Sequence, residues 1–532
     1  MTPSTVSLVP EYHSHEEFQN RSRKLSEIRA LGIDPYPPKF VPTATTAQLT
    51  IDHEGKEIGH SDDAASGSTP RAVISGRLVL FRAMGKNAFA QVQDETGRIQ
   101  VMFNRDLTTV KGFTPTEELN ALKFIEKKLD LGDIVGIEGH LFKTQRGELT
   151  IFAKTVTLLA KSLLPLPDKH SGLADKGVCY KKRWLDLITH PESLDRFRKR
   201  SKILFSIRKT MADAGFEEVE TPVLQNIYGG ASAEPFTTHL NALKQDMFLR
   251  IALEISLKKL IVGGMPKVFE IGKIFRNEGI DRTHNPEFTM MEAYAAGWDY
   301  NDMMDFVEQI FAEVALNVYG DTAIRFTGTS ESTACVIDLK IPWIRMSMKE
   351  AIKTYGGLDA DAMSDSEMKA TLLKQTHIDP KDVHPASRGE LIAMLFEEFA
   401  EHHLIQPHHI TDHPIETTPL CKPHRDPKHR KEGLVERFES FILGREMCNS
   451  YTELNDPELQ RQLLVDQAQK RVEGDLEASP LDEEFIEAIC QGMPPTGGVG
   501  IGIDRLVMLF TDAESIRDVL FFPLMRSDEG EK

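Results

Sequence analysis

Residues suited to holding a polyphosphate and a positively charged group gather between Val268 and Trp298. This stretch, VFEIGKIFRNEGIDRTHNPEFTMMEAYAAGW, is typical of two β-strands joined by a polar loop, with side chains alternating between two faces. Alternation directs these residues toward one place: Glu270, Arg276, Glu278, Phe288, Glu292 and Tyr294. The loop adds His284 and Asn285. A salt-bridged, solvated hairpin would explain any one of these residues, but not the whole set.

Two further segments could face the hairpin. Gly498 to Phe510 is a glycine-rich strand that enters an amphipathic helix, with Arg505 at the junction. Repeated glycines let a ligand approach the backbone, and the arginine can lie over a purine or reach a phosphate. No βαβ unit surrounds this stretch, so it is not a dinucleotide-binding fingerprint. Gly230 and Glu254 add a backbone turn and a carboxylate at the start of a helix.

A third segment, Glu436 to Glu453, offers carboxylates for a divalent cation. Glu439 and Glu446 fall on either side of the expected turn at Gly444, near enough to share one cation. Mg²⁺ needs few protein carboxylates when triphosphate oxygens complete its shell. On the strand that follows, alternation places Asn449, Tyr451 and Glu453 on one side. A solvated hairpin edge is the alternative interpretation of the two glutamates.

Together these charges indicate a class of substrate. Arg276, Arg505 and His284 suit a polyphosphate, and an aromatic ring such as that of Phe288 suits a stacked adenine. The surplus carboxylates with Tyr294 suit a small ligand that bears positive charge, because a buried ammonium is costly unless it is paired. ATP and a cationic amino acid would satisfy both halves.

The elements that must position these residues form one large α+β domain. We expect it over residues 180–532, with a helical insertion at about 345–410. Ahead of it we expect an N-terminal helix and connector over 1–70, a small β-barrel over 71–163 and a linker over 164–179. Within 1–70, residues 43–70 are rich in Thr, Ser, Asp and Gly, which predicts a poorly packed connector.

The sequence of residues 71–163 predicts a series of short strands separated by turns. Five strands with a helix after the third match a Greek-key barrel of the OB type, which commonly binds single-stranded nucleic acid or sugars. On its face Phe89 could stack a base, while Gln100 and Glu148 could read base edges. Each of these residues taken alone is better explained as an ordinary barrel side chain.

Bulk composition sets limits on the class of protein. The length of 532 residues suggests two to four domains, and 40% hydrophobic with 27% charged residues is ordinary for a soluble protein. A net charge of −18 argues against non-specific coating of nucleic acid. Five scattered cysteines without a CxxC pair suit reduced thiols in the cytoplasm, and no apolar run is long enough for a membrane span.

Several motifs now match a known family. FRNEGIDRTHNPEFTMMEAY resembles the second signature motif of class II aminoacyl-tRNA synthetases, in the form typical of lysyl-tRNA synthetases. GFEEVETPVLQ is similar to the first motif and GVGIGIDRLVML to the third. GGASAEPF, CNSYTELND and RLVLFRAMGKNAFAQVQD are also similar to that family, so the resemblance covers nearly the whole chain. It implies an antiparallel catalytic sheet flanked by helices, a homodimer, and ATP, L-lysine and tRNA(Lys) as partners.

The resemblance also implies residue roles. Arg276 would hold the α-phosphate and the lysine carboxylate, and adenine would lie between Phe288 and Arg505. Further ATP contacts would come from Glu278, His284, Asn285 and Glu439, and the ligands of Mg²⁺ would be Glu439 and Glu446. The lysine pocket would comprise Gly230, Glu254, Glu292, Tyr294, Asn449, Tyr451 and Glu453. The barrel would read the anticodon with Phe89, Gln100 and Glu148.

Three alternative functions and one competing site remain. A relative that aminoacylates a protein lysine generally lacks the barrel expected at 71–163, and an aspartyl or asparaginyl enzyme needs a less acidic pocket. A non-catalytic RNA-binding protein would not need Arg276 and Arg505 together with Glu439 and Glu446. The histidine-rich run from His402 to His424 does not follow a structural-zinc spacing, so we expect a loop and subdomain junction there.

Overall fold

The computed structural model describes residues 10–167, 173–327, 334–474 and 478–526. By its internal contacts the chain divides into two compact units, Met1–Gly172 and Leu173–Lys532. Among the described residues, no helix combines the length and apolar character that a membrane span needs.

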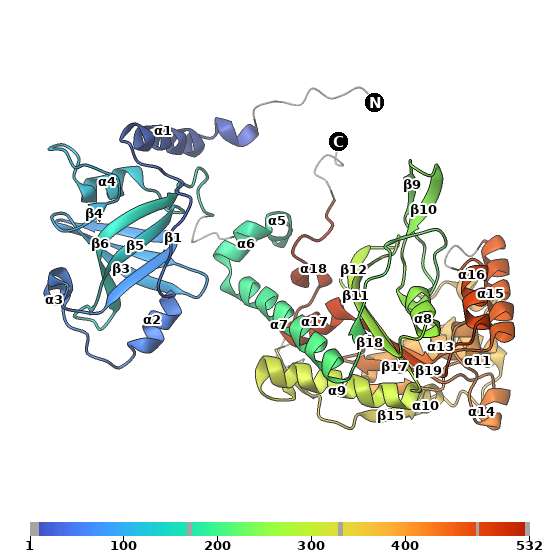
Figure 1. Ribbon diagram of the computed structural model, residues 1–532. Coiled ribbons are helices and arrows are strands. Elements are labelled where there is room, and N and C mark those ends of the chain that lie inside the picture. Colours follow the sequence, from blue (N-terminus) through green and yellow to red (C-terminus); the bar gives the residue numbers. More distant parts are fainter. Residues whose placement is uncertain (1–9, 168–172, 328–333, 475–477, 527–532) are drawn as a thin grey trace. The chain divides into compact units, whose positions relative to one another are not determined.

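The first unit is a small β-barrel with short helices around it (Figure 1). Its strands are β1 (Arg71–Met84), β2 (Asn87–Gln93), β3 (Arg98–Asn104), β4 (Thr109–Val110), β5 (Ile134–Lys143) and β6 (Leu149–Ala160). Its helices are η1 (Glu11–Ser14), α1 (Glu16–Ala30), α2 (Thr46–Asp52), α3 (Ser61–Ser66) and α4 (Ala121–Lys128). The strand order is β3-β2-β1-β5-β6-β4, and a parallel pairing of β3 with β6 closes the barrel. The predicted OB-type barrel is confirmed.

Alternation along the strands creates the interior of the barrel. In β2 the side chains of Ala88, Ala90 and Val92 are buried, while Phe89 and Gln91 between them are only partly covered. The segment 43–70, expected as a poorly packed connector, instead contains α2 and α3, and Leu49 of α2 joins the core. Threonine, serine and aspartate indicated turns there, but the same residues also cap short helices.

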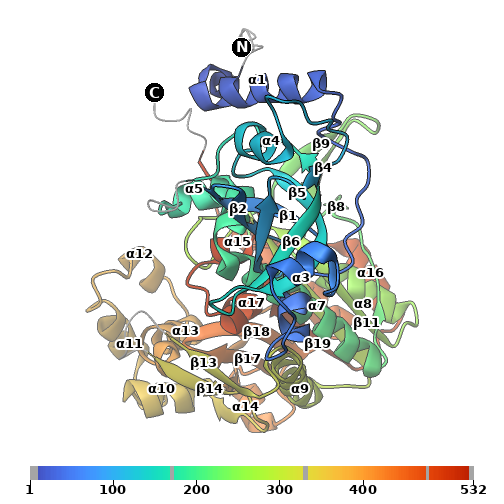
Figure 2. The ribbon, with the colours of Figure 1, turned by 90° about the vertical axis from the view of Figure 1, so that its left-hand side faces the viewer.

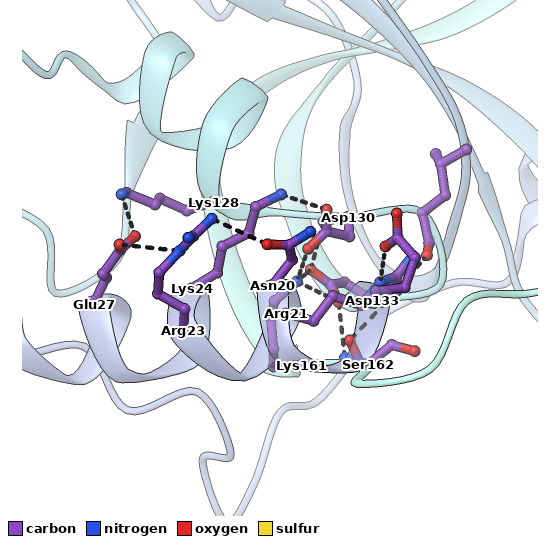
Figure 3. A network of polar contacts seen from close by, with 12 residues as sticks. Asn20, Arg21, Arg23, Lys24, Glu27, Lys128, Asp130, Asp133, Lys161 and Ser162 are labelled. Atoms are coloured by element: carbon purple, nitrogen blue, oxygen red, sulfur yellow. Dashed lines mark hydrogen bonds and ion pairs between the residues drawn. The ribbon is translucent and has the colours of Figure 1, made fainter. Parts of the chain in front are cut away.

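Helix α1 is anchored on the barrel by buried charges (Figure 3). Arg21 Nη1 donates to Leu131 O at 3.0 Å, and Lys24 Nζ lies 2.6 Å from Asp130 Oδ1. Lys161, which is fully buried, contacts Asp130 at 2.5 Å and Asp133 at 2.9 Å. Buried charges of this kind are tolerated only when paired, so the helix is an integral part of the barrel unit.

The second unit is built on a large sheet covered by helices (Figure 1). Its strands are β7 (Glu217–Glu218), β8 (Leu224–Gln225), β9 (Thr237–Leu240), β10 (Gln245–Leu249), β11 (Lys267–Phe275), β12 (Glu287–Ala296), β13 (Ala323–Phe326), β14 (Cys335–Asp338), β15 (Ile344–Ser347), β16 (His408–Thr411), β17 (Arg437–Ile442), β18 (Arg445–Thr452) and β19 (Thr496–Gly502). Its helices are α5 (Lys176–Lys181), α6 (Arg183–Thr189), α7 (Pro191–Asp213), α8 (Glu254–Val262), α9 (Tyr300–Tyr319), α10 (Met348–Gly356), α11 (Asp365–Leu372), α12 (Pro380–Val383), α13 (Arg388–Phe399), η2 (Glu401–His403), η3 (Ile415–Thr417), α14 (Pro427–Lys431), α15 (Pro457–Val472), α16 (Glu483–Cys490), α17 (Ile503–Thr511) and α18 (Ile516–Val519).

The main sheet of this unit runs in the order β15-β16-β17-β18-β19-β12-β11-β7. Its pairings are antiparallel from β16 to β11 and parallel at both edges. One face packs on α7, α9 and α17 through a core that includes Met291, Ala293 and Phe311. Since side chains alternate along a strand, the residues between these on β12 face the opposite side, where they line a cavity. This agrees with the predicted antiparallel catalytic sheet flanked by helices.

The helices α10 to α13 form a lobe beside the sheet, visible in Figure 2. The lobe has its own core, which includes Met348, Leu391 and Phe396. The histidine-rich run expected as a loop contains β16, a strand of the main sheet, with His408 and His409 buried. Polar residues suggested a loop there, but His408 bonds to Tyr355 Oη and Gln406 O, and His409 Nδ1 bonds to Ser440 Oγ.

Candidate active site

A cavity of about 400 Å³ lies on the face of the sheet opposite α9. The following elements contribute to its lining: β12, α8, β18, β19, the loop that joins β11 to β12, and residues 228–232. Of the residues predicted for ATP and lysine, all except Glu439 line this cavity. The structure therefore brings together segments that are more than 200 residues apart in the chain.

The inner end of the cavity is acidic and closed. Leu253 N donates to Glu292 Oε1 at 2.9 Å, and Tyr294 Oη donates to Glu292 Oε2 at 3.0 Å. Tyr451 Oη donates to Glu254 Oε2 at 2.6 Å. Burial and the neighbouring Glu254 carboxylate raise the pKa of Glu292 to about 7. The two phenols therefore hold two carboxylates in place at this end.

Glu453 completes this acidic end and is only 1% exposed. One of its carboxylate oxygens, Oε2, forms an ion pair with Lys258, whereas Oε1 has no hydrogen-bond partner among the residues that the structure describes. Gly498 makes room for that oxygen, because a Cβ at this position would lie 1.9 Å from Glu453 Oε1. A buried carboxylate oxygen without a partner is costly unless a cationic ligand reaches it.

Gly230 borders the same end from the other side. Its φ of +88° is a conformation that favours glycine, and a Cβ would approach Ala252 Cβ at 3.0 Å and Glu254 Cβ at 3.1 Å. A side chain at this position would therefore press on the carboxylate that Tyr451 holds.

Arg276 stands at the end of β11, where the acidic pocket meets the polar loop. Its Nε donates to Ile251 O at 3.4 Å, and its guanidinium carbon lies 5.3 Å from the centre of the Phe288 ring. It forms no ion pair with any residue that the structure describes, and burial lowers its pKa. An unpaired, partly buried guanidinium is suited to bind a carboxylate or phosphate.

The loop between β11 and β12 reaches Arg505 through His284. Asp281 Oδ2 lies 2.7 Å from His284 Nδ1, and Arg505 Nη2 lies 3.2 Å from His284 Nε2. Because arginine can only donate, Nε2 accepts and Nδ1 carries the proton given to Asp281. Arg505 also donates to Glu446 Oε2 at 3.1 Å. His284, Arg505 and Glu446, each predicted for the site separately, thus form one connected set.

Glu278 and Asn285 line the cavity from the same loop. Glu278 is exposed. The side chain of Asn285 is buried, and its Nδ2 donates to Glu287 O at 2.6 Å. Its Oδ1 has no partner in the described part of the chain. This free acceptor can bind a donor such as an adenine amino group.

A second cavity, of about 530 Å³, shares His284, Arg505 and Glu446 with the first. Glu439 lines only this second cavity, while Glu446 lines both. Burial and the nearby carboxylates of Glu397, Glu439 and Glu446 raise the pKa of Glu401 to about 7. Crowded carboxylate oxygens that repel one another fit a hard cation such as Mg²⁺, so the residues present are compatible with the predicted metal.

Asn449 is linked to Glu439 through a residue that sequence reasoning missed. Arg437 Nε donates to Asn449 Oδ1 at 3.0 Å, and its Nη2 lies 2.5 Å from Glu439 Oε1. Arg437 precedes Glu439 by two positions on β17, so strand alternation could have revealed it.

The remaining missed residues left weaker signals in the sequence. Glu397, Glu401 and Arg445 line the second cavity, and the first two come from the lobe and its end. Lys258 contacts Glu254 and Glu453. In the sequence, its spacing from Glu254 suggests only an ordinary i,i+4 ion pair on a helix.

One residue of the predicted hairpin set does not belong to the site. Glu270 is buried by Arg250, whose Nη1 lies 2.6 Å away, and its other oxygen accepts from Thr221. Glu270 lies on the strand face that was predicted, but Arg250 and Thr221 already occupy both of its carboxylate oxygens.

On the barrel, the three residues predicted to contact an anticodon come from β2 (Phe89), from β3 (Gln100) and from the turn directly before β6 (Glu148). Gln91 pairs with Gln100 across β2 and β3, and Gln91 Nε2 donates to Glu148 Oε1 at 3.1 Å. Phe89 precedes Gln91 by two positions and therefore shares its outward face. Gln91 is the member of this group that sequence reasoning missed.

In the structure, the histidines of the run from His402 to His424 contact protein groups. His409 lies near Ser440 Oγ and Glu308, and His413 bonds to Ile410 O. His424 comes close to Asp412 and His429, but its Nδ1 already accepts from Asp426 N at 3.0 Å. The neutral ring then carries its proton on Nε2, the atom that faces Asp412, which opposes metal binding there.

Comparisons with known proteins agree with this geometry. A family model described as tRNA synthetases class II (D, K and N) matches residues 175–526, and one described as OB-fold nucleic acid binding domain matches residues 72–159. A lysine–tRNA ligase from Chlamydia felis is 55% identical over 99% of this chain and 100% of its own length. Lysine–tRNA ligases from Methanoculleus marisnigri (95% of this chain, 94% of its own) and a Thermoanaerobacter species (96% of each) are 46% and 44% identical. The chain therefore belongs to the class II tRNA synthetase family, among the lysine–tRNA ligases.

Proposed function

We propose that this protein activates L-lysine with ATP to lysyl-adenylate, releasing pyrophosphate, and transfers the lysine to the 3′ end of tRNA(Lys). The observation that carries the proposal is the free Oε1 of Glu453 at the closed end of the cavity, together with Arg276 where that acidic end meets the polar loop. This part of the cavity is thus complementary to an ammonium at its closed end and to a carboxylate at Arg276. Lysine carries both.

In this proposal the pocket residues orient lysine and take no covalent part. Glu453 and Tyr294 receive the side-chain ammonium, with Glu254, Glu292, Gly230, Asn449 and Tyr451 completing the pocket. Arg276 holds the lysine carboxylate and the α-phosphate together, so that the carboxylate attacks phosphorus in line and pyrophosphate leaves. A ribose hydroxyl at the tRNA 3′ end then attacks the carbonyl and releases AMP.

The nucleotide contacts come from the loop and from the third motif. Phe288 and Arg505 enclose the adenine, and Glu278, His284 and Asn285 place the rest of ATP. Glu439 and Glu446 would hold Mg²⁺, which when bound neutralises charge on the triphosphate. The support for this is the crowding of carboxylates around the second cavity.

Three further parts of the proposal concern partners and location. The barrel face with Phe89, Gln100 and Glu148 reads the anticodon, which its outward aromatic and amide groups support. The protein acts as a homodimer, consistent with the exposed apolar side chains of Phe205 and Leu224 around the first motif. Five free cysteines support a cytoplasmic location.

The direct test is pyrophosphate–ATP exchange with each of the standard amino acids, followed by charging of tRNA(Lys). Lysine should give the highest exchange rate. If the exchange rate is highest with aspartate or asparagine, that amino acid and not lysine is the substrate. The absence of exchange with every amino acid would favour a non-catalytic RNA-binding protein. Exchange with lysine but no charging of tRNA would point to a protein lysine acceptor.

A further inference from the structure

Lys258 lies behind the acidic end of the cavity and does not line it. It is fully buried on α8, between the rings of Tyr451 at 5.5 Å and Phe485 at 5.9 Å. Its Nζ contacts both Glu254 Oε1 and Glu453 Oε2. One ammonium of the protein thus joins two pocket carboxylates that lie almost 200 residues apart in the chain.

The contact with Lys258 decides which oxygen of Glu453 is offered to a ligand. With Oε2 engaged by Lys258, Oε1 is the oxygen that remains free beside Gly498. Glu254 differs, because its second oxygen already accepts from Tyr451. Without Lys258 the Glu453 carboxylate would have no cation to fix its rotation.

The charge on Lys258 is permanent in this environment. Burial alone would lower the pKa of its ammonium, but the attraction of Glu254 and Glu453 raises that pKa to about 12. The Lys258 side chain therefore remains charged across the physiological pH range, and its ion pairs with Glu254 and Glu453 are not lost by deprotonation.

The residues directly before and at the start of α8 also contact Arg276, at the mouth of the acidic pocket. Ile251 O accepts from Arg276, Leu253 N donates to Glu292, and Lys258 ties Glu453 to the same helix. Residues 251–258 are thus a common support for the group that would receive the carboxylate of a substrate and the group that would receive its side-chain ammonium.

We propose that Lys258 is a positioning residue that sets the depth of the pocket, so that the distance from Arg276 to Glu453 Oε1 selects the side-chain length of lysine. This inference rests on the proposed function. It assigns length selection to a residue that touches neither the amino acid nor ATP, and it distinguishes Lys258 from a cation that merely neutralises buried charge. A neutralising role alone predicts a loss of stability without a change in selectivity.

The test compares lysine with ornithine, which is one methylene shorter, in pyrophosphate–ATP exchange. Lys258→Met removes the charge and keeps much of the apolar stem, while Lys258→Arg keeps the charge with a different reach and a planar head. Lys259→Met is the matched control, because Lys259 is the next residue on the same helix and contacts Glu484 at the surface. Thermal midpoints of all variants report on folding.

We expect the lysine-to-ornithine ratio of kcat/KM to fall by at least about tenfold in Lys258→Met, mainly through a higher KM for lysine, since one methylene is worth about 10- to 200-fold in a well-defined pocket. Lys258→Arg should show a smaller fall, and Lys259→Met no change. A folded Lys258→Met variant with the wild-type ratio would overturn the proposal. If that variant does not fold, the ratio in Lys258→Arg decides, and an unchanged ratio overturns it.

This experiment distinguishes a failure of the role of Lys258 from a failure of the proposed function. Lysine-dependent exchange by the wild-type protein, together with unchanged ratios in the variants, contradicts the role of Lys258 alone. Absence of lysine-dependent exchange in the wild-type protein contradicts the proposed function and with it the length selection.

Discussion

The two ends of the candidate active site differ in how much of their charge is already paired. At the amino-acid end, Glu254 and Glu292 are each 4% exposed and are held by phenols, a backbone N–H and Lys258. At the nucleotide end, the side chains of His284 and Glu446 are 51% and 39% exposed, and carboxylates crowd one another around an open cavity.

This difference indicates a division of labour. A closed, hydrogen-bonded pocket discriminates between ligands because a wrong group leaves buried partners unpaired. The open nucleotide end is lined by four carboxylates beside three arginines, Arg437, Arg445 and Arg505. Since the carboxylates repel a triphosphate, we expect a divalent cation to accompany the nucleotide. We therefore expect the amino-acid end to be complete before ATP arrives, and the nucleotide end to be completed by its substrate.

Arg276 belongs to both ends, so its replacement should have the largest effect. Arg276→Ala should lower the rate of lysine-dependent exchange by about 10³-fold or more, since a preorganised donor to developing charge is lost. Its stability should not fall, because Arg276 forms no ion pair with the described residues and burial already disfavours its charge. Exchange kinetics and thermal melting test this, with Lys273→Ala on the same strand as the control. Near-normal exchange in Arg276→Ala would remove it from the mechanism.

Glu453→Gln should affect only the amino-acid end. We expect kcat/KM for lysine to fall about 10²- to 10³-fold, because the ammonium of the substrate and that of Lys258 each lose a buried carboxylate partner. Binding of ATP with Mg²⁺, measured as a shift in melting temperature, should not change. A loss of nucleotide binding of similar size would contradict the separation of the two ends.

Glu446→Gln should affect only the nucleotide end. The concentration of Mg²⁺ that gives half-maximal exchange should rise about 10- to 100-fold, and saturating Mg²⁺ should restore part of the rate. Lysine binding without nucleotide should keep its wild-type affinity. An unchanged requirement for Mg²⁺ would exclude Glu446 as a ligand.

The smallest expected effect is a pH dependence of lysine affinity. Burial and the Glu254 carboxylate raise the pKa of Glu292 to about 7. The hydrogen bonds from Leu253 and Tyr294 and the charge of Arg276 act in the opposite direction and lower that pKa. The ammonium of lysine favours the ionised carboxylate, so affinity should improve as pH rises through about 7, by at most about tenfold per pH unit. Calorimetric titration between about pH 5.5 and about pH 8 keeps the ligand ammonium charged. Glu292→Gln should flatten the profile, and identical profiles in both proteins would exclude Glu292 as the titrating group.

Much of the fold follows from local patterns in the chain. Alternation in β2 separates the core residue Val92 from the outward Gln91, and alternation in β12 separates the core residue Met291 from Glu292, which faces the cavity. The helices in 43–70 escaped prediction because their capping residues are also turn residues.

The site was predictable where its residues belong to long motifs, and less so where tertiary contacts assign their roles. Glu292 and Tyr294 share a strand face, which the sequence displays. Nothing local distinguishes Glu270, which Arg250 neutralises, from Glu292 directly opposite it. The role of Lys258 depends on its contact with Glu453, almost 200 residues away, and no periodicity reports such a contact.

The central claim is that the acidic pocket selects lysine before ATP binds. Calorimetric titration of the wild-type protein with L-lysine, in the presence of a chelator and without nucleotide, tests it most directly. We predict saturable binding with one site per chain, no comparable binding of aspartate, and weaker binding of ornithine. Lysine binding that requires ATP and Mg²⁺ would contradict the account.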